Sequence, residues 1–283
     1  MENTLTIEPQ KPGVVSSMPW LGRIVCGDNT EVLSGFPAEC VDLVVTSPPY
    51  DDLRTYGGHS WDFFGLAWLL KRVLKPGGVI VWVVNDATLD GSETGSSMEQ
   101  ALHFRRLGLN LHDTMVYASD KPPLNSNRYE HAWEYMFVLS KGAPKTVNKL
   151  KTRSLHGGKT NSSRRYYRAN GEVKEMSKPG IYNEEKVLPN IWWYATGLEK
   201  TGHPAVYPIA LAKDHIASWS NPGDVVLDPF AGSGTTCKAA KELERQWCGI
   251  EINPKYCAIA EGRLSQDVLQ LETCAMRPND QAQ

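Results

Sequence analysis

The 283-residue chain is 41% hydrophobic and has 30 basic against 32 acidic side chains, for a formal net charge of −2. Its apolar runs, such as Val79 to Val84, are too short to cross a bilayer, and its first residues lack a basic stretch followed by an apolar one. We therefore expect a cytoplasmic protein and exclude a membrane-spanning one. Six cysteines are scattered without a Cys-x-x-Cys pair, which predicts reduced thiols and no metal site.

After a polar arm over residues 1–20, apolar strands alternate with helices in the first half of the chain. Hydrophobic periodicity predicts strands at 23–27, 41–46, 79–84, 109–117 and 132–139, with helices near 30–33, 61–74 and 97–107. The strand Val41 to Thr46 is apolar on both faces, which suits the centre of a parallel sheet. Lys75-Pro76-Gly77-Gly78 is a stop signal for the helix before it.

Residues 141–188 differ from the rest of the chain in charge and in pattern. They contain twelve Lys or Arg and four Asp or Glu, a net charge of +8, with tyrosines between the basic residues and no apolar periodicity. The remainder of the chain then has a net charge of about −10. This asymmetry indicates a segment that faces a polyanion, although a charge run alone can also be a solvated surface.

Regular patterning returns at Asn190 and continues almost to the C-terminus. We expect helices at 208–219, 235–243 and 255–269, strands at 224–228 and 247–251, and a flexible tail over 271–283. Alternating strands and helices predict a doubly wound α/β fold with a mostly parallel sheet.

A buried strand runs into a glycine-rich turn and a helix at Val225 to Thr236. Glycines let the backbone approach a ligand closely, and a helix N-terminus offers unpaired N–H groups. About twenty residues later the next strand ends with the carboxylate of Glu251, where nucleoside-binding folds bind ribose hydroxyls. The loop lacks the lysine of a triphosphate site and the spacing of a dinucleotide site, so we expect a nucleoside with a cationic tail.

The second loop, Ser47-Pro48-Pro49-Tyr50, follows the buried strand 41–46 and so lies at a carboxyl end of the sheet. Two prolines fix the backbone and remove two N–H donors, which leaves a rigid loop rich in carbonyl acceptors. Such acceptors stabilise the positive charge that grows on an exocyclic base nitrogen as it attacks a methyl group. Tyr50 supplies a ring on which a base can stack. Tyr50→Phe keeps that ring, so we expect it to be mild.

Together the two loops resemble those of the DNA amino-methyltransferases. The order, with the catalytic loop at 46–50 before the cofactor loop at 228–234, resembles the circularly permuted beta group of that family. The resemblance implies a permuted class I methyltransferase fold, S-adenosyl-L-methionine as cofactor and double-stranded DNA as substrate. It also implies a division into an arm (1–20), a catalytic half (21–140), a target-recognition insertion (141–190), a cofactor-binding half (191–270) and a tail (271–283).

The resemblance also assigns roles to particular residues. Ser47, Pro48, Pro49 and Tyr50 would hold and stack the target base. The cofactor would contact residues at or just after the ends of three strands and a short segment before the helix at 208–219. These residues are Asp28, His203, Pro204, Asp228, Phe230, Gly232, Ser233, Gly234, Thr235 and Glu251. Arg164, Arg165 and Arg168 would contact DNA. A second base-stacking aromatic is left open among Tyr129, Trp133 and Tyr135.

Several alternatives remain. Serine before Pro-Pro-Tyr resembles the cytosine-N4 enzymes, while Asp or Asn there resembles the adenine-N6 enzymes, so cytosine N4 is favoured and adenine N6 is the alternative. Methyltransferases of proteins or small molecules that have Asn-Pro-Pro-Tyr loops place the cofactor loop first, the reverse of this chain. A non-catalytic DNA-binding protein with a decayed methylase fold would not need both loops intact. A separate restriction endonuclease is a conceivable partner.

Overall fold

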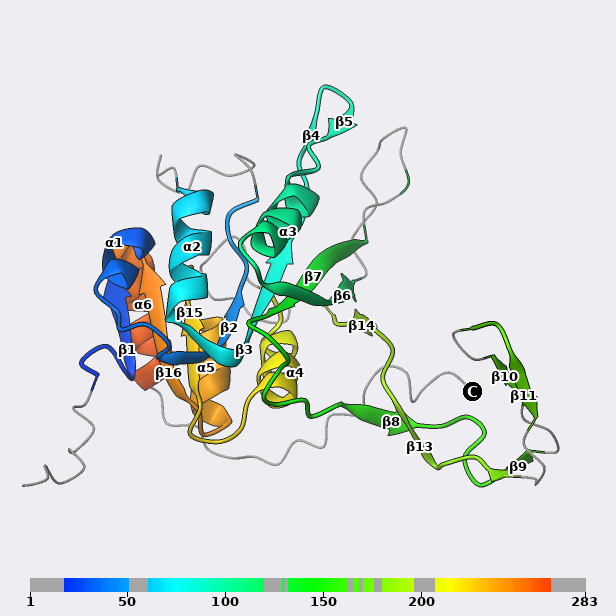
Figure 1. Ribbon diagram of the computed structural model, residues 1–283. Helices are drawn as coiled ribbons and strands as arrows, with labels where there is room; N and C mark the ends of the chain where they lie inside the picture. Colours follow the sequence, from blue (N-terminus) through cyan, green and yellow to red (C-terminus); the bar gives the residue numbers. More distant parts are fainter. Residues whose placement is uncertain are drawn as a thin grey trace, which may run out of the picture.

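The computed structural model describes residues 18–50, 61–119, 129, 132–161, 165–167, 170–175, 180–195 and 207–265. The predicted arm, apart from its last three residues, and the predicted tail lie outside these ranges. Strands are labelled as in Figure 1.

One eight-stranded sheet organises the described residues. In spatial order it consists of β1 (Arg23–Cys26), β16 (Gln246–Glu251), β15 (Val225–Asp228), β2 (Val41–Thr46), β3 (Leu74–Val84), β7 (Trp133–Ser140), β6 (Asn110–Ala118) and β14 (Ile191–Trp193). Only β7 runs antiparallel to its neighbours in this sheet. The predicted doubly wound, mostly parallel fold is confirmed.

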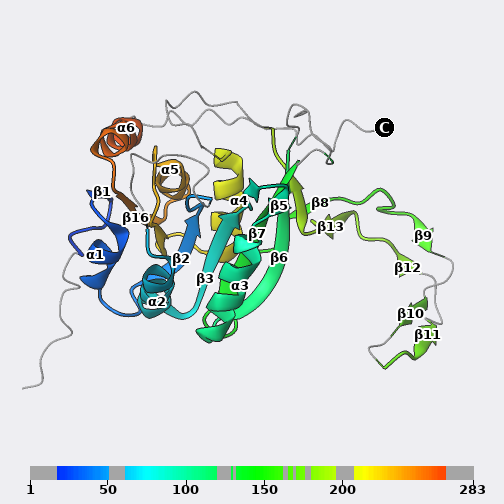
Figure 2. The same cartoon turned by 90° about the horizontal axis from the view of Figure 1, so that it is seen from above.

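Helices cover both faces of the sheet (Figures 1 and 2). One face has α1 (Asn29–Ser34), α2 (Phe63–Val73) and α3 (Ser96–Arg106), and the other has α4 (Ile209–Trp219), α5 (Thr235–Glu242) and α6 (Pro254–Ser265). Leu66, Leu70 and Phe104 pack with Trp82 in the core of the first face. Leu211 and Ala239 pack with Val226 on the second. Burial on both faces explains why the central strands are apolar throughout.

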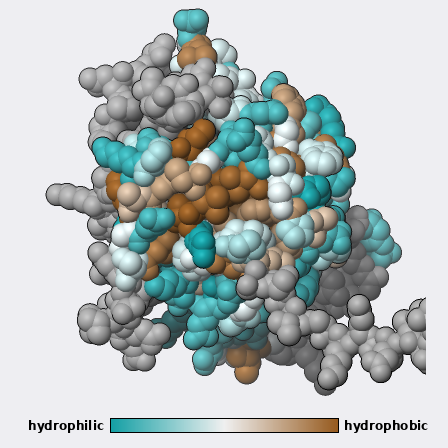
Figure 3. All heavy atoms as spheres, turned by 90° about the vertical axis from the view of Figure 1, so that its left-hand side faces the viewer, coloured by the Kyte–Doolittle hydropathy of each residue, from teal (hydrophilic) through white to brown (hydrophobic). Residues whose placement is uncertain are grey.

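The edge strand β1 borders a partly apolar surface. Figure 3 shows the face of the molecule on which β1, α1 and α6 lie, with apolar side chains reaching the surface near its centre. Val25 of β1 and Val32 of α1 are half-buried and pack against the main core.

The predicted helix stop at residues 75–78 is confirmed, but these residues also form the start of a strand. Helix α2 ends at Val73 and β3 begins at once with Leu74, so the Lys-Pro-Gly-Gly segment forms the first part of the strand. Gly77 has φ +76°, and a Cβ there would lie 2.9 Å from the Cβ of Lys145. Glycine is needed here because both the backbone angle and the close approach exclude a side chain.

Residues 151–187 form nested antiparallel pairs where the sequence predicted only the loss of apolar periodicity. Strand β8 (Lys151–Arg153) pairs with β13 (Glu185–Val187), β9 (Thr160–Asn161) with β12 (Gly180–Ile181), and β10 (Arg165–Tyr167) with β11 (Val173–Glu175). Figures 1 and 2 show this ribbon extending away from the sheet. A smaller hairpin, β4 (Thr88–Leu89) with β5 (Ser92–Glu93), was also missed although its Asp-Gly turn is a hairpin signal.

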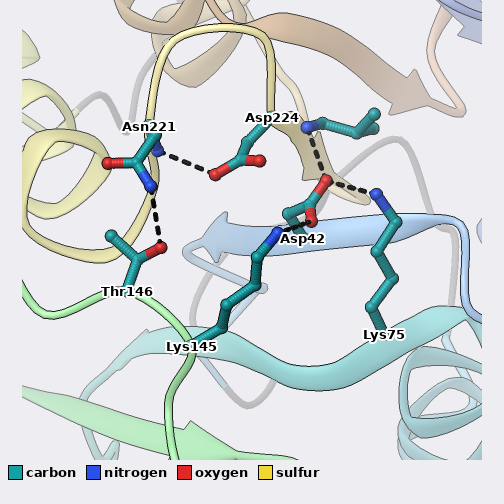
Figure 4. Close-up of polar contacts among 7 residues, drawn as sticks. Asp42, Lys75, Lys145, Thr146, Asn221 and Asp224 are labelled. Atoms are coloured by element: carbon teal, nitrogen blue, oxygen red, sulfur yellow. Dashed lines mark hydrogen bonds and ion pairs between the residues drawn. The ribbon is translucent and has the colours of Figure 1, made fainter.

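Asp42 joins the segment after β7 to the amino ends of the central strands (Figure 4). Its carboxylate is buried, and it accepts from Lys75 Nζ at 2.6 Å and from the backbone N–H of Val225 at 2.9 Å. Lys145 Nζ lies 3.9 Å away. Beside it, Asn221 Nδ2 donates to Thr146 Oγ1 at 3.1 Å. These contacts fix the base of the basic segment on the body.

Candidate active site

The two predicted loops meet at one edge of the sheet because they follow neighbouring parallel strands. Strand β15 pairs with β2, with Leu227 opposite Val44, so both strands end at the same edge. There Thr46 Oγ1 donates to Asp228 Oδ1 at 2.7 Å in a buried hydrogen bond. The backbone N–H of Phe230 donates to the same oxygen at 3.0 Å. The end of the first loop's strand is therefore joined directly to the start of the second loop.

The glycine-rich loop between β15 and α5 has the backbone that its sequence predicts. Gly232 has φ +50° and Gly234 has φ +79°, both in the left-handed region that favours glycine. A Cβ on Gly234 would lie 3.1 Å from the Cβ of Ala260. Glu251 closes this loop, since its Oε2 accepts from Gly232 N at 2.8 Å and its Oε1 from Asn253 N at 2.9 Å.

Asp228 is a buried acid whose ionisation is disfavoured. Burial raises the pKa of its carboxyl from 3.8 to about 6, against the opposing effect of hydrogen bonds from Thr46, Thr236 and Phe230, and the charge of Glu251 adds to the rise. A group in this state gains from a nearby cation, because the cation would replace the solvation that burial removed. Thr236 in turn contacts the Tyr207 hydroxyl, which the sequence analysis did not assign.

Asp28 lies at the same edge but its carboxylate has a structural role. It caps α1 by accepting from Thr30 N at 2.8 Å and Glu31 N at 3.1 Å. Partial burial acts to raise its pKa, but hydrogen bonds from the Thr30 hydroxyl and from these two N–H groups outweigh it and hold the pKa below the ordinary value. The next residue, Asn29, is buried and donates to the Pro229 carbonyl at 3.3 Å. The turn after β1 is thereby held against the glycine-rich loop between β15 and α5.

The side chains of Ser233 and Thr235 face α6. Arg263 Nη1 donates to the Ser233 carbonyl at 2.6 Å, to its hydroxyl at 2.9 Å and to the Thr235 hydroxyl at 3.3 Å. Both residues are buried. The sequence did not predict this role of Arg263, because the pattern of a helix does not indicate which of its basic side chains binds a loop thirty residues earlier.

The Ser-Pro-Pro-Tyr loop places three polar groups in a row. Ser47 Oγ lies 2.9 Å from the Tyr50 hydroxyl, which donates to Glu134 Oε2 at 2.7 Å. Pro48 is buried, and Tyr50 is half-buried against the main core. Glu134, on β7, was not assigned from the sequence, although an acid near the start of the apolar strand 132–139 was the available signal.

Several aromatic rings pack against the same core as Tyr50. Trp61 meets Phe230 edge-on with ring centroids 5.1 Å apart. Of the three candidates for a second stacking ring, Tyr135 stacks on Phe137 at 4.8 Å and contacts Trp133 edge-on, while Tyr129 is fully exposed. The choice among them stays open, and Trp61 is a further aromatic that the sequence analysis did not name.

Five predicted site residues cannot be compared in full. His203, Pro204, Arg164 and Arg168 lie outside the described residues, and Arg165 is described only as part of the backbone of β10.

The sheet order, the glycine loop and the strand-end acid define a class I methyltransferase fold. A model of the DNA methylase family matches residues 41–262. The chain therefore belongs to the DNA methylase family of N6 and N4 amino-methyltransferases.

Two curated relatives agree with this family. The chain is 48% identical over 239 residues to the orphan methyltransferase M.BamHII of Bacillus amyloliquefaciens, covering 81% of this chain and 90% of the relative. It is 33% identical over 258 residues to the DNA adenine methyltransferase YhdJ of Escherichia coli K12, covering 85% and 82%.

Solved structures have the same fold. The Thermus thermophilus protein TTHA0409, complexed with S-adenosyl-L-methionine, matches with a TM-score of 0.59 and 26% identity over 86% of this chain and 92% of that one. The cytosine-N4-specific PvuII DNA methyltransferase matches with a TM-score of 0.65 and 22% identity, over 87% and 90%, which supports the fold alone.

Within the described ranges, no helix is long and apolar enough to cross a membrane. A search of the same residues finds no group of three or more His, Cys, Asp or Glu side chains arranged to hold a metal ion.

Proposed function

We propose that this protein is an S-adenosyl-L-methionine-dependent DNA methyltransferase that methylates the exocyclic amine of a base flipped out of duplex DNA, with cytosine N4 as the favoured position. The observation that supports it most is the Thr46–Asp228 hydrogen bond, because it brings the Ser-Pro-Pro-Tyr loop and the glycine loop together at one edge of the sheet. Binding at that edge is typical of α/β sheets.

The residues at this edge fit the chemistry of S-adenosyl-L-methionine. When bound, this cofactor supplies a methyl group on a sulfonium cation. Asp228 is a buried acid that a cation would stabilise, and Gly232 and Gly234 allow close backbone approach. Glu251 is the acceptor for ribose hydroxyls, and it is already oriented by Gly232 N. Phe230 lies in the same loop, while the Asp28 carboxylate caps α1 and is oriented by that contact. Asp28, His203 and Pro204 are assigned to the cofactor by resemblance only.

The Ser47–Tyr50 loop would act on the target base. Pro48 and Pro49 have no N–H, so the loop presents carbonyl acceptors to an amine and no competing donors at these positions. Acceptors on the amine hydrogens stabilise the positive charge that develops on nitrogen during attack. Because the amine is buried in duplex DNA, the base has to be flipped out to reach this loop, and Tyr50 offers a stacking surface for it.

The proposed target-recognition region is the basic segment 141–190, which contains the antiparallel ribbon of residues 151–187. Its net charge of +8 favours contact with phosphates, and a two-stranded ribbon has dimensions that the major groove admits. The ribbon extends away from the sheet (Figure 2). We further propose a cytoplasmic location. A companion endonuclease is not required, since one relative is named an orphan methyltransferase.

The choice of base rests on Ser47. Serine at this position resembles the cytosine-N4 enzymes, whereas the adenine methyltransferase YhdJ is a 33% identical relative and keeps adenine N6 as the alternative. Digestion of DNA treated with the purified protein and cofactor, followed by mass spectrometry of the nucleosides, decides between them. N4-methylcytosine supports the proposal, N6-methyladenine corrects the base, and no methylated nucleoside contradicts the activity.

A further inference from the structure

A chain of three oxygen groups connects the catalytic loop to the sheet. Ser47 Oγ lies 2.9 Å from Tyr50 Oη, and Tyr50 Oη lies 2.7 Å from Glu134 Oε2. Ser47 and Tyr50 belong to the loop after β2, whereas Glu134 is the second residue of β7, 84 positions after Tyr50. A base that stacks on Tyr50 needs only the aromatic ring. The hydrogen bonds of the Tyr50 hydroxyl to Ser47 and Glu134 therefore suggest a second role for this residue.

The number of hydrogens that each group can donate fixes which group is the donor in each of these two hydrogen bonds. A phenol has one hydrogen to donate, and an ionised carboxylate can only accept. The Tyr50 hydroxyl therefore donates to Glu134. The bond between Ser47 and Tyr50 then needs a hydrogen from Ser47, so the Ser47 hydroxyl donates to Tyr50 Oη.

This direction decides what Ser47 offers to a substrate. With its hydrogen turned toward Tyr50, the Ser47 oxygen presents lone pairs and acts as an acceptor for an amine N–H. If Tyr50 instead donated to Ser47, the serine hydrogen would turn away from Tyr50 and could meet the amine as a competing donor. A neutral or absent group in place of Glu134 would permit that reversed arrangement.

Tyr117 is a further polar neighbour of Glu134, and it does not compete for this role. It lies directly opposite Glu134 in the β6–β7 pairing and is buried, and burial together with the negative charge of Glu134 raises its pKa to about 12. Its hydroxyl therefore stays protonated. Tyr117 makes no contact with Ser47 among the hydrogen bonds of the described residues, so it serves as a matched control.

We propose that Glu134 is a positioning residue that acts through the Tyr50 hydroxyl to hold Ser47 as a hydrogen-bond acceptor for the target amine. This inference rests on the proposed methyltransferase function. Loss of Glu134 or of the Tyr50 hydroxyl should therefore lower the rate of methyl transfer. It should not weaken cofactor binding, which we assign to the glycine-rich loop.

The test is a double-mutant cycle with Glu134→Gln, Tyr50→Phe and the pair together, with Tyr117→Phe as control. The single-turnover rate of methyl transfer is measured with radiolabelled S-adenosyl-L-methionine and unmethylated phage DNA, both saturating. Each single variant should be slower by about 10- to 100-fold. This is less than the roughly 10²- to 10³-fold cost of removing a preorganised group that touches the reacting atoms, because both variants act through Ser47. Because both act through one hydroxyl, the double variant should be no slower than the slower single one.

Tyr117→Phe should stay within about twofold of wild type, since it changes the surroundings of Glu134 but not the chain to Ser47. The melting temperature and its increase with cofactor should be retained in all four variants, which separates positioning from folding. Wild-type rates in Glu134→Gln or Tyr50→Phe, multiplied effects in the double variant, or an equal loss in Tyr117→Phe would each overturn the inference. No transfer by the wild-type protein would instead contradict the proposed function.

Discussion

Thr46 Oγ1 donates a 2.7 Å hydrogen bond to Asp228 Oδ1, although 182 positions separate the two residues in the chain. The bond is buried, and it connects the strand ends that precede the two loops of the proposed active site. The Thr46 hydroxyl thus favours ionisation of Asp228, although burial raises the pKa of that carboxyl overall.

The first prediction concerns stability against pH. The pKa of Asp228 is raised from 3.8 to about 6 by burial, so between these values the native state binds more protons than the unfolded state. Stability should therefore fall as pH rises from about 4 to about 6, by about 3 kcal/mol from this group alone, and then level off. Asp228→Asn should lack this fall. Urea unfolding of both proteins at pH 4.5 and 7 measures it, and equal pH dependence would remove Asp228 as the cause.

The second prediction concerns cofactor binding at the same residue. An ionised Asp228 attracts the cationic cofactor, so the cofactor-induced increase in melting temperature should shrink as pH falls from 7 to 5. Asp228→Asn should reduce the increase at pH 7 and change it much less at pH 5. Glu261→Gln, which changes an exposed acid on α6, serves as the charge control. An undiminished increase in Asp228→Asn at pH 7 would place the cofactor elsewhere.

The third prediction concerns the contacts at the opposite end of the strands. Asp42→Ala leaves the Val225 N–H and Lys75 without their buried acceptor (Figure 4). The free energy of unfolding should fall by about 1 to 3 kcal/mol. Lys145→Ala should cost little, because its ammonium is 3.9 Å away and its side chain is 65% exposed. Denaturant unfolding measures the free energy of unfolding of both variants. A similar decrease in both would show that the Asp42–Lys145 pair stabilises the protein more than the contact with the Val225 N–H.

The fourth prediction concerns DNA. Neutralising Arg164, Arg165 and Arg168 together should weaken DNA binding and flatten its salt dependence, by up to about 0.9 in the log–log slope for each lost phosphate contact. The matched control neutralises three exposed basic residues of the body, Arg105, Arg106 and Lys255. Equal salt slopes for the two triple variants would mean that the cluster is only a solvated surface.

The sequence was sufficient for much of the fold. Apolar strands such as Val41–Thr46 and the glycine turn after Asp228 are local patterns, because burial on both faces and left-handed backbone angles restrict the residue types. The hairpins between residues 151 and 187 were not predicted, because short exposed strands such as β8 and β13 have no buried face to set a period of two.

The site was predictable only where a motif marks it. Ser47, Tyr50, Asp228 and Glu251 belong to recognisable loops. Long-range partners leave no such pattern, because a hydrogen bond from one strand end to another depends on three-dimensional placement and not on spacing in the chain. Glu134, Asn29 and Arg263 are partners of this kind. The role assigned to Tyr50 changed for this reason, from a ring alone to a ring with a hydroxyl bound on both sides.

The last prediction separates the two parts of the catalytic loop. Ser47→Ala removes an acceptor that acts while positive charge grows on the amine, so it should slow methyl transfer by about 10²-fold and leave cofactor affinity within a few-fold. Tyr50→Ala also removes a stacking surface, worth about 1 to 3 kcal/mol per base, so it should weaken capture of the flipped base as well.

DNA with a mismatch at the target base distinguishes these two defects. A mismatched base costs less to unstack, so the mismatch should partly restore transfer by Tyr50→Ala, whose loss lies in holding the flipped base. Ser47→Ala should gain much less, because its loss lies in the transition state. Single-turnover rates on matched and mismatched duplexes give both comparisons. A wild-type rate in Ser47→Ala would contradict the role of this loop, and equal rescue of the two variants would show that Tyr50 does not act in holding the base.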